Sequence, residues 1–206
     1  MVRRIGVLVC LVAFATTGRA NGAPPPPFNI VVDIQNYAMV DKWTLRTAKS
    51  ETGRVFAQMG IQIDWRESSQ VIERVGVPAF SIVMLSTSMA AEKARRDGVP
   101  TVTLATSSQS TGRAYVFYAR LSAVAAERKY DDGLMLAHVL MHELGHMIAN
   151  IGHEPFGVMR KFLELKETGF FGFTAAQKVA IRAALAGAMA TPVPMIALRA
   201  VPDMTR

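Results

Sequence analysis

The chain of 206 residues contains very little cysteine and few charged or aromatic side chains. Its single cysteine, Cys10, has no partner for an intramolecular disulfide, which excludes a small disulfide-stapled scaffold. No apolar run reaches the roughly 20 residues that are needed to span a bilayer. Charged residues make up 19% of the chain and hydrophobic residues 50%, so a sizeable core can form and a largely disordered chain is excluded.

The N-terminal region has the three parts of a secretory signal peptide. Two arginines precede an apolar run over residues 5–15, and the small and polar stretch T-T-G-R-A-N-G-A follows it. The apolar run is too short for a membrane anchor. We therefore predict a signal peptide over residues 1–23, cleaved after Ala20 or Ala23, and a secreted or periplasmic protein with no stable membrane anchor.

The formal net charge of +7 raises the question of a nucleic-acid partner. Arg3, Arg4 and Arg19 belong to the predicted signal peptide, so the exported chain would carry a charge of +4. It has no cluster of lysine and arginine interleaved with aromatic residues. The exported chain would also have no thiol nucleophile, because its single cysteine, Cys10, belongs to the predicted signal peptide. We predict that it binds no nucleic acid, and its oligomeric state stays open.

Helical and strand patterns alternate along the remainder of the chain, which predicts an α/β (α+β) fold with a mixed twisted sheet. We predict one domain over residues 24–187 and a C-terminal tail over residues 188–206. Strands are predicted at 28–35, 61–65, 80–85 and 114–121, with a short one at 102–106 before a loop at 107–112. Helices are predicted at 42–59, 89–96, 131–150 and 174–187, with Asp41 as an N-cap and T-A-A-Q at 174–177 as a capping box.

The motif H-E-L-G-H at residues 142–146 lies within the predicted helix 131–150. Side chains four residues apart share one face of a helix, so His142 and His146 can bind one metal ion. Zinc accepts neutral imidazole, and a catalytic zinc site has three protein ligands and leaves a fourth position for water. Glu143 would take a proton from this water as the water attacks a carbonyl group.

A candidate for the third zinc ligand follows the helix. His153 comes after Asn150 and Gly152, two residue types that tolerate a left-handed backbone. They can end the helix and turn the chain until His153 faces the metal. Gly157 and Met159 follow a few residues later.

This arrangement resembles the metzincin zinc peptidases, in which a third histidine follows a glycine turn and a methionine turn lies beneath the metal. H-E-L-G-H followed by G-H-E-P-F-G-V-M-R is also similar to a group of uncharacterised exported bacterial proteins predicted to be metallopeptidases. The likeness covers most of residues 28–187. It implies a compact metzincin-like domain, zinc held by the three histidines, a methionine turn at Met159, and a peptide or protein substrate.

Two departures from the metzincin pattern keep other third ligands open. Ala149 stands where the family has a glycine, and six residues separate the last two histidines where metzincins have five. Lys161 takes the position at which some metzincins carry a tyrosine that contacts zinc or the oxyanion, so that role is not carried over. A later glutamate, as in peptidases resembling thermolysin, is the alternative ligand: Glu164, Glu167 or the nearer Glu154.

Other residues near the motif allow two interpretations. His138 lies one turn before the motif, but only two residues of a straight helix reach one ion, so we predict a supporting or core role for it. Tyr115, Phe117 and Tyr118 either line a substrate groove or face the core, because side chains of a strand alternate between its faces. If strand 114–121 lies at the sheet edge, its backbone can hold an extended peptide as an added strand.

These patterns together predict an exported zinc metalloendopeptidase in which Glu143 activates water. Two alternatives stay open. One is a zinc hydrolase of a non-peptide amide such as one in the cell wall, because the motif specifies activated water and not the acyl group. The other is a non-catalytic exported binding module with structural zinc, in which a fourth protein ligand would replace water.

Overall fold

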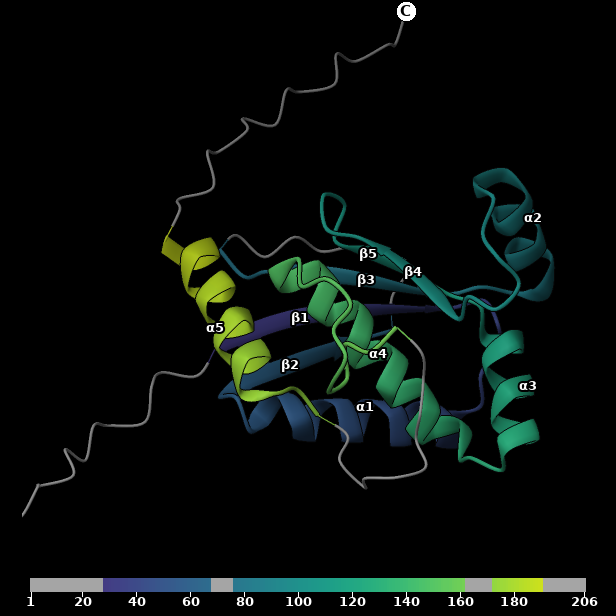
Figure 1. Ribbon diagram of the computed structural model, residues 1–206, viewed down its shortest axis with the longest axis horizontal. Coiled ribbons are helices and arrows are strands. Elements are labelled where there is room, and N and C mark those ends of the chain that lie inside the picture. Colours follow the sequence, from purple (N-terminus) through teal and green to yellow (C-terminus); the bar gives the residue numbers. More distant parts are fainter. Residues whose placement is uncertain (1–27, 68–75, 162–171, 191–206) are drawn as a thin grey trace, which may run out of the picture.

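A five-stranded sheet organises the part of the chain that the computed structural model describes, residues 28–67, 76–161 and 172–190. The strands are β1 (Phe28–Asn36), β2 (Ile61–Arg66), β3 (Ala79–Met84), β4 (Ala105–Ser108) and β5 (Arg113–Val116). The helices are α1 (Lys42–Ala57), α2 (Thr87–Asp97), α3 (Tyr118–Arg128), α4 (Asp132–Ala149) and α5 (Ala175–Ala190). The strand order is β2-β1-β3-β5-β4, with β4 antiparallel to β5 and all other pairs parallel (Figure 1). The predicted α/β domain with one mixed sheet is confirmed.

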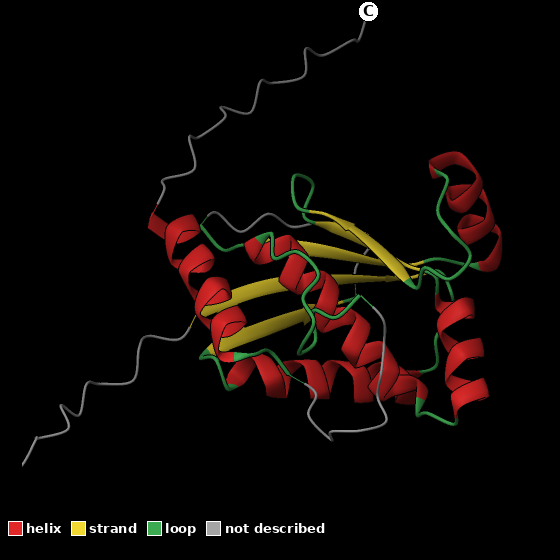
Figure 2. Cartoon of the chain, in the orientation of Figure 1, coloured by secondary structure: helices red, strands yellow, loops and turns green. Residues whose placement is uncertain are grey.

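The core lies between the sheet and the helices α1, α4 and α5 (Figure 2). Ile30, Val32 and Ile34 alternate along β1 and are almost fully buried on this side of the sheet. Helices α1 and α4 approach closely because Gly133 has no side chain: a Cβ there would lie 2.6 Å from the Cβ of Thr47. In Figure 1, α4 crosses the sheet between α1 and the β4–β5 hairpin.

The ends of the long helices follow the predicted capping signals. Asp41 accepts hydrogen bonds from the backbone N–H groups of Trp43 and Thr44 in the first turn of α1, and Asp131 accepts one from the backbone N–H of Leu134 in the first turn of α4. Thr174 and Gln177 form the predicted capping box of α5, each side chain bonding the other's backbone N–H. Helix α5 continues to Ala190, so its last turn includes the first residues of the segment predicted as a tail.

The predicted strand 114–121 is wrong in its second half. Strand β5 ends at Val116, and α3 begins at Tyr118. Phe117, Leu121 and Ala125 are spaced four residues apart and are fully buried, and this is the helical period. The burial of this stripe outweighs the β-propensity of the aromatic residues that precede it. The predicted loop at 107–112 is also shorter, because its first two residues belong to β4.

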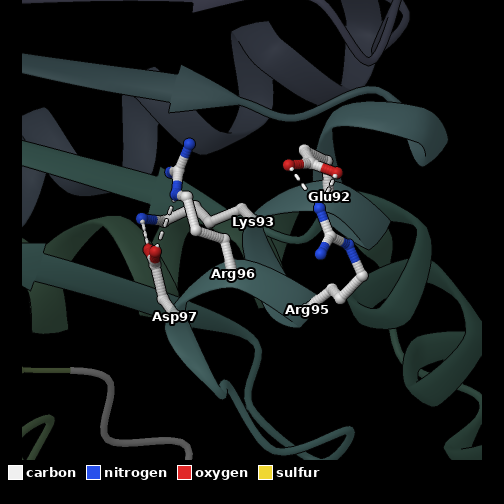
Figure 3. A network of polar contacts seen from close by, with 5 residues as sticks. All are labelled: Glu92, Lys93, Arg95, Arg96 and Asp97. Atoms are coloured by element: carbon white, nitrogen blue, oxygen red, sulfur yellow. Dashed lines mark hydrogen bonds and ion pairs between the residues drawn. The ribbon is translucent and has the colours of Figure 1, made fainter.

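Helix α2 lies apart from the other helices, at one end of the sheet (Figure 1). None of its residues is buried, and its charges pair within the helix: Lys93 and Arg96 both bond Asp97, and Arg95 bonds Glu92 (Figure 3). The ammonium group of Lys93 lies 3.9 Å from the ring centroid of a β5 tyrosine. Helix α2 is therefore a solvated surface helix that its own ion pairs support.

The predicted signal peptide, residues 1–23, and most of the predicted tail, residues 188–206, lie outside the described residues. Within the described ranges, no helix combines the length and the apolar character needed to cross a membrane.

Candidate metal centre

The motif H-E-L-G-H occupies the fourth turn of α4 and the start of the fifth, where His142 and His146 share one face as predicted. The two Nε2 atoms are 3.0 Å apart. Two ligands of a tetrahedral zinc ion, with bonds of about 2.05 Å, would be separated by about 3.3 Å, so the pair is close to the spacing that zinc needs.

Backbone carbonyl groups bond the Nδ1 atoms of both rings, on the side away from the paired Nε2 atoms. The Nδ1 atom of His142 lies 2.9 Å from the carbonyl oxygen of Val158, and the Nδ1 atom of His146 lies 2.5 Å from that of Ile151. Because a carbonyl oxygen only accepts, each Nδ1 carries the proton, and each Nε2 keeps its lone pair for a metal. Burial lowers the pKa of both rings, which favours the neutral form that binds a metal.

The chain turns back after α4 and brings a third histidine to this pair. Asn150 adopts the left-handed conformation (φ 50°) that ends the helix, as predicted, whereas Gly152 is not in that region. The ring of His153 stacks on that of His142, with centroids 5.2 Å apart and an angle of 27° between the planes. One ligand atom from each of the three histidines lies within 4.8 Å of the others, so the cluster can hold a metal ion.

Met159, the residue predicted for a methionine turn, packs against α4 at the H-E-L-G-H motif. It is fully buried, and a Cβ at position 145 would lie only 2.5 Å from its sulfur atom. Gly145 is therefore the residue of the motif that lets the methionine approach the helix. Gly157 turns the chain just before it with a φ of 72°, and the next residue supplies the carbonyl group that bonds His142.

Glu143 lies on the neighbouring face of the helix turn and is only 5% exposed. Burial raises the pKa of this carboxyl group, and a hydrogen bond from the Ser107 side chain and the nearby His146 oppose this shift. A carboxylate with a raised pKa is a better proton acceptor near neutral pH than an exposed glutamate. The sequence predicts a loop at Ser107, and nothing in its local pattern indicates a contact with Glu143.

A cavity of about 820 Å³ opens beside this cluster. The three histidines and Glu143 line one side of it, and residues 102–107 and Gln109 line the other. Strand β4 is the last strand of the sheet, and its outer edge pairs with no other strand among the described residues. The sheet edge beside the three-histidine cluster is thus β4, and β5, which contains the first residues of the predicted strand 114–121, lies inside the sheet.

Gln177 on α5 fixes the loop that carries His153, and the sequence identified only its capping function. It is 1% exposed. Its side-chain amide donates to the carboxylate of Glu154 over 2.7 Å and to the carbonyl oxygen of Phe156 over 3.2 Å. Its Oε1 atom accepts from the backbone N–H of Thr174. One buried amide thus connects the start of α5 to the residue that follows the third histidine.

Of the other residues that the sequence offered for the site, those that the structure describes do not join the cluster. The carboxylate of Glu154 is held by α5, while Glu164 and Glu167 lie outside the described residues. Neither Tyr115 nor Phe117 lines the cavity: Phe117 is buried, and Tyr115 lies beneath α2. Tyr118 is in α3, where its hydroxyl group donates a hydrogen bond to the carboxylate of Asp132. These aromatic side chains therefore have structural roles.

His138 lines the cavity one turn before His142 but is not part of the three-histidine cluster. Burial lowers its pKa to about 4, and the neighbouring His142 adds to this shift. In the unfolded chain, His138 has a pKa near 6.5. Between about pH 4 and pH 6.5, His138 is therefore protonated more readily in the unfolded chain than in the folded chain. The free energy of unfolding therefore falls as the pH falls from about 6.5 to about 4.

We predict that His138→Phe removes part of this pH dependence. For the metal-free protein, the shift from 6.5 to about 4 corresponds to a loss of up to roughly 3 kcal/mol on acidification, and the variant lacks this contribution. Urea unfolding of both proteins at pH 7 and pH 4.5 measures the difference. Parallel losses of stability in the two proteins would show that His138 is not buried in its neutral form.

Comparison with known proteins adds no family to this geometry, because the chain matches neither a protein-family model nor any of the curated proteins with which it was compared.

Proposed function

We propose that this chain is an exported, metzincin-like zinc peptidase that hydrolyses peptide or protein substrates. The observation that carries the proposal is the convergence of His142, His146 and His153 beside a buried Glu143, at the wall of an open cavity. Three neutral imidazoles suit zinc, and the described residues offer no fourth His, Cys, Asp or Glu within the cluster. This donor set fits a catalytic zinc site better than a closed structural site.

Each residue of the centre then has a defined task. A zinc ion in this site would act as a Lewis acid on the substrate carbonyl group and would acidify water. Glu143 accepts a proton from the attacking water and passes it to the amine that leaves. Its burial keeps it poised for this transfer, and the Ser107 hydroxyl group orients the carboxylate. The carbonyl oxygens of Ile151 and Val158 hold the two helix histidines in the tautomer that presents Nε2.

The edge strand β4 supports a peptide as the substrate. It runs along the cavity opposite Glu143, and an extended chain can pair with its outer edge as an added strand. Such pairing would hold the backbone of the substrate in one register while one of its carbonyl groups faces the three histidines. A sequence-tolerant backbone interaction of this kind is suited to an endopeptidase.

We predict that the zinc-loaded protein cleaves an unfolded protein substrate, that a chelator stops the cleavage, and that added zinc restores it, because the three histidines alone supply no Lewis acid. Product peptides identified by mass spectrometry and zinc content measured on the same sample provide the test. Cleavage that persists after the metal is removed would contradict the proposal.

Assays with a second substrate, and a measurement of the zinc coordination, separate the two alternatives. Hydrolysis of cell-wall amides with no cleavage of unfolded proteins would favour the non-peptide hydrolase. Zinc that is bound with four protein ligands, determined by X-ray absorption, together with no hydrolysis of either substrate, would favour the binding module with structural zinc.

A further inference from the structure

The loop that follows α4 contributes more to the three-histidine cluster than His153. The carbonyl oxygens of Ile151 and Val158 accept hydrogen bonds from the Nδ1 atoms of the two helix histidines. The loop over residues 151–158 therefore carries one ring and orients the other two. A residue that fixes this loop acts on all three rings at once.

Gln177 on α5 fixes the loop with both N–H groups of its side-chain amide. Its Nε2 atom donates to the carboxylate of Glu154 over 2.7 Å and to the carbonyl oxygen of Phe156 over 3.2 Å. Its Oε1 atom accepts from the backbone N–H of Thr174, and a Cβ at Gly157 would lie only 2.8 Å from this oxygen. Two acceptors on the loop require a donor at this buried position, which glutamine has and an ionised glutamate lacks.

The helix that carries this amide is itself fixed to the core. Ile181 and Leu185 are almost fully buried. The guanidinium group of Arg182 donates to the carbonyl oxygen of Met59 and lies 4.9 Å from the ring centroid of Phe28. Helix α5 therefore provides a fixed base, and the amide bonds connect the loop to it.

We propose that Gln177 is a positioning residue of the zinc site: by fixing the loop over residues 151–158, its amide sets the geometry of the three histidines and so the affinity for zinc. This inference rests on the zinc site of the proposed function. Neither Gln177 nor Glu154 lines the cavity, so the amide touches neither metal nor substrate and acts only through the loop.

The substitution Gln177→Glu separates positioning from helix capping. Glutamate keeps an oxygen that accepts from the backbone N–H of Thr174, so the capping box of α5 is retained. Its carboxylate, however, places oxygen against the two acceptors of the loop. We expect the zinc affinity, measured by competition with a chelator at one pH, to fall by roughly 10- to 100-fold. The visible spectrum of the cobalt-loaded protein should change as well, because it reports the ligand geometry, which a mere loss of stability would not alter.

Exchanging the two side chains provides the rescue. In the protein with both Gln177→Glu and Glu154→Gln, the new amide can donate to the new carboxylate, so most of the zinc affinity and the cobalt spectrum should return. Glu154→Gln alone should change both little, because an amide oxygen still accepts from Gln177. The matched control is Ala176→Glu, which adds the same charge at the exposed neighbouring position and should leave the affinity unchanged.

The outcomes distinguish this inference from the peptidase proposal. Equal zinc affinity and an equal cobalt spectrum in Gln177→Glu, or a loss that the exchange leaves unchanged, would reject the positioning role and retain the peptidase. Zinc binding that depends on Gln177 in this way, with no cleavage by the unsubstituted protein, would retain the positioning role and reject the peptidase. An unsubstituted protein that binds no zinc would reject both.

Discussion

Replacing Glu143 with glutamine should reduce peptide cleavage by at least about 100-fold while leaving the metal content unchanged. General-base catalysis contributes roughly 10²- to 10⁴-fold, and glutamine cannot accept the proton. The substitution keeps the size of the side chain and an oxygen that can accept the hydrogen bond from Ser107. Because Glu143 is not one of the three clustered ligands, zinc should stay bound. Cleavage rate and zinc content have to be measured on one preparation.

The stability of this variant distinguishes lost catalysis from a damaged fold. Burial raises the pKa of Glu143, which means that holding the charged form at neutral pH destabilises the folded state. The neutral amide removes this cost, so the melting temperature of the metal-free variant should be equal to or higher than that of the metal-free unsubstituted protein. Glu92→Gln on the exposed helix α2 is the matched control and should keep full activity. Undiminished cleavage by Glu143→Gln would reject the general-base role.

The helix that carries the motif could be predicted because its signals are local. Asp131 caps α4 through a hydrogen bond between its side chain and a backbone N–H of the first turn. Asn150 ends α4 because asparagine tolerates the left-handed backbone conformation that this position requires. The spacing of His142 and His146 then determines their common face. Every one of these relations spans fewer than twenty residues of chain, so the sequence contains them directly.

The contacts that support the three-histidine cluster are ones that sequence patterns do not encode. Ser107 reaches Glu143 only because β4 folds back antiparallel beside β5 and lies against α4. Gln177 holds the loop after His153 although more than twenty residues separate them. The pattern T-A-A-Q predicts a capping box and contains no sign of this second function. The role of Gly145 likewise depends on Met159, which only the fold places beneath it.

The identity of the edge strand beside the cavity also depends on the fold. Residues 114–121 are rich in aromatic and β-branched side chains, whereas β4 has the sequence A-T-S-S, and only its first two residues belong to a predicted strand. Strand propensity mainly reflects how well a side chain packs, and an edge strand beside an open cavity packs little. A polar, short strand is also what protects an exposed edge from pairing with other chains. The strand that lines the cavity is therefore the one with the weakest strand signal.

The second large effect is expected for His153, the ligand whose assignment depends on a turn one residue longer than in metzincins. His153→Ala leaves two imidazoles, and a catalytic zinc site normally has three protein ligands. The affinity for zinc should therefore fall by more than the roughly 10- to 100-fold that follows the loss of a residue that only supports a ligand. Because imidazole must be neutral to bind, competition with a chelator has to be measured at a single pH for all variants.

Three glutamate variants decide between the possible third ligands. Glu154→Gln should change zinc affinity little, since its carboxylate accepts a hydrogen bond from Gln177 instead of facing the histidines. Glu164→Gln and Glu167→Gln should leave the affinity nearly unchanged if His153 completes the site. If the His153 variant keeps its affinity and one of these glutamate variants loses it, the third ligand is that glutamate, as in peptidases resembling thermolysin. The stacking of His153 on His142 would then be a contact between rings and not part of a metal site, and the methionine-turn interpretation of Met159 would fail with it.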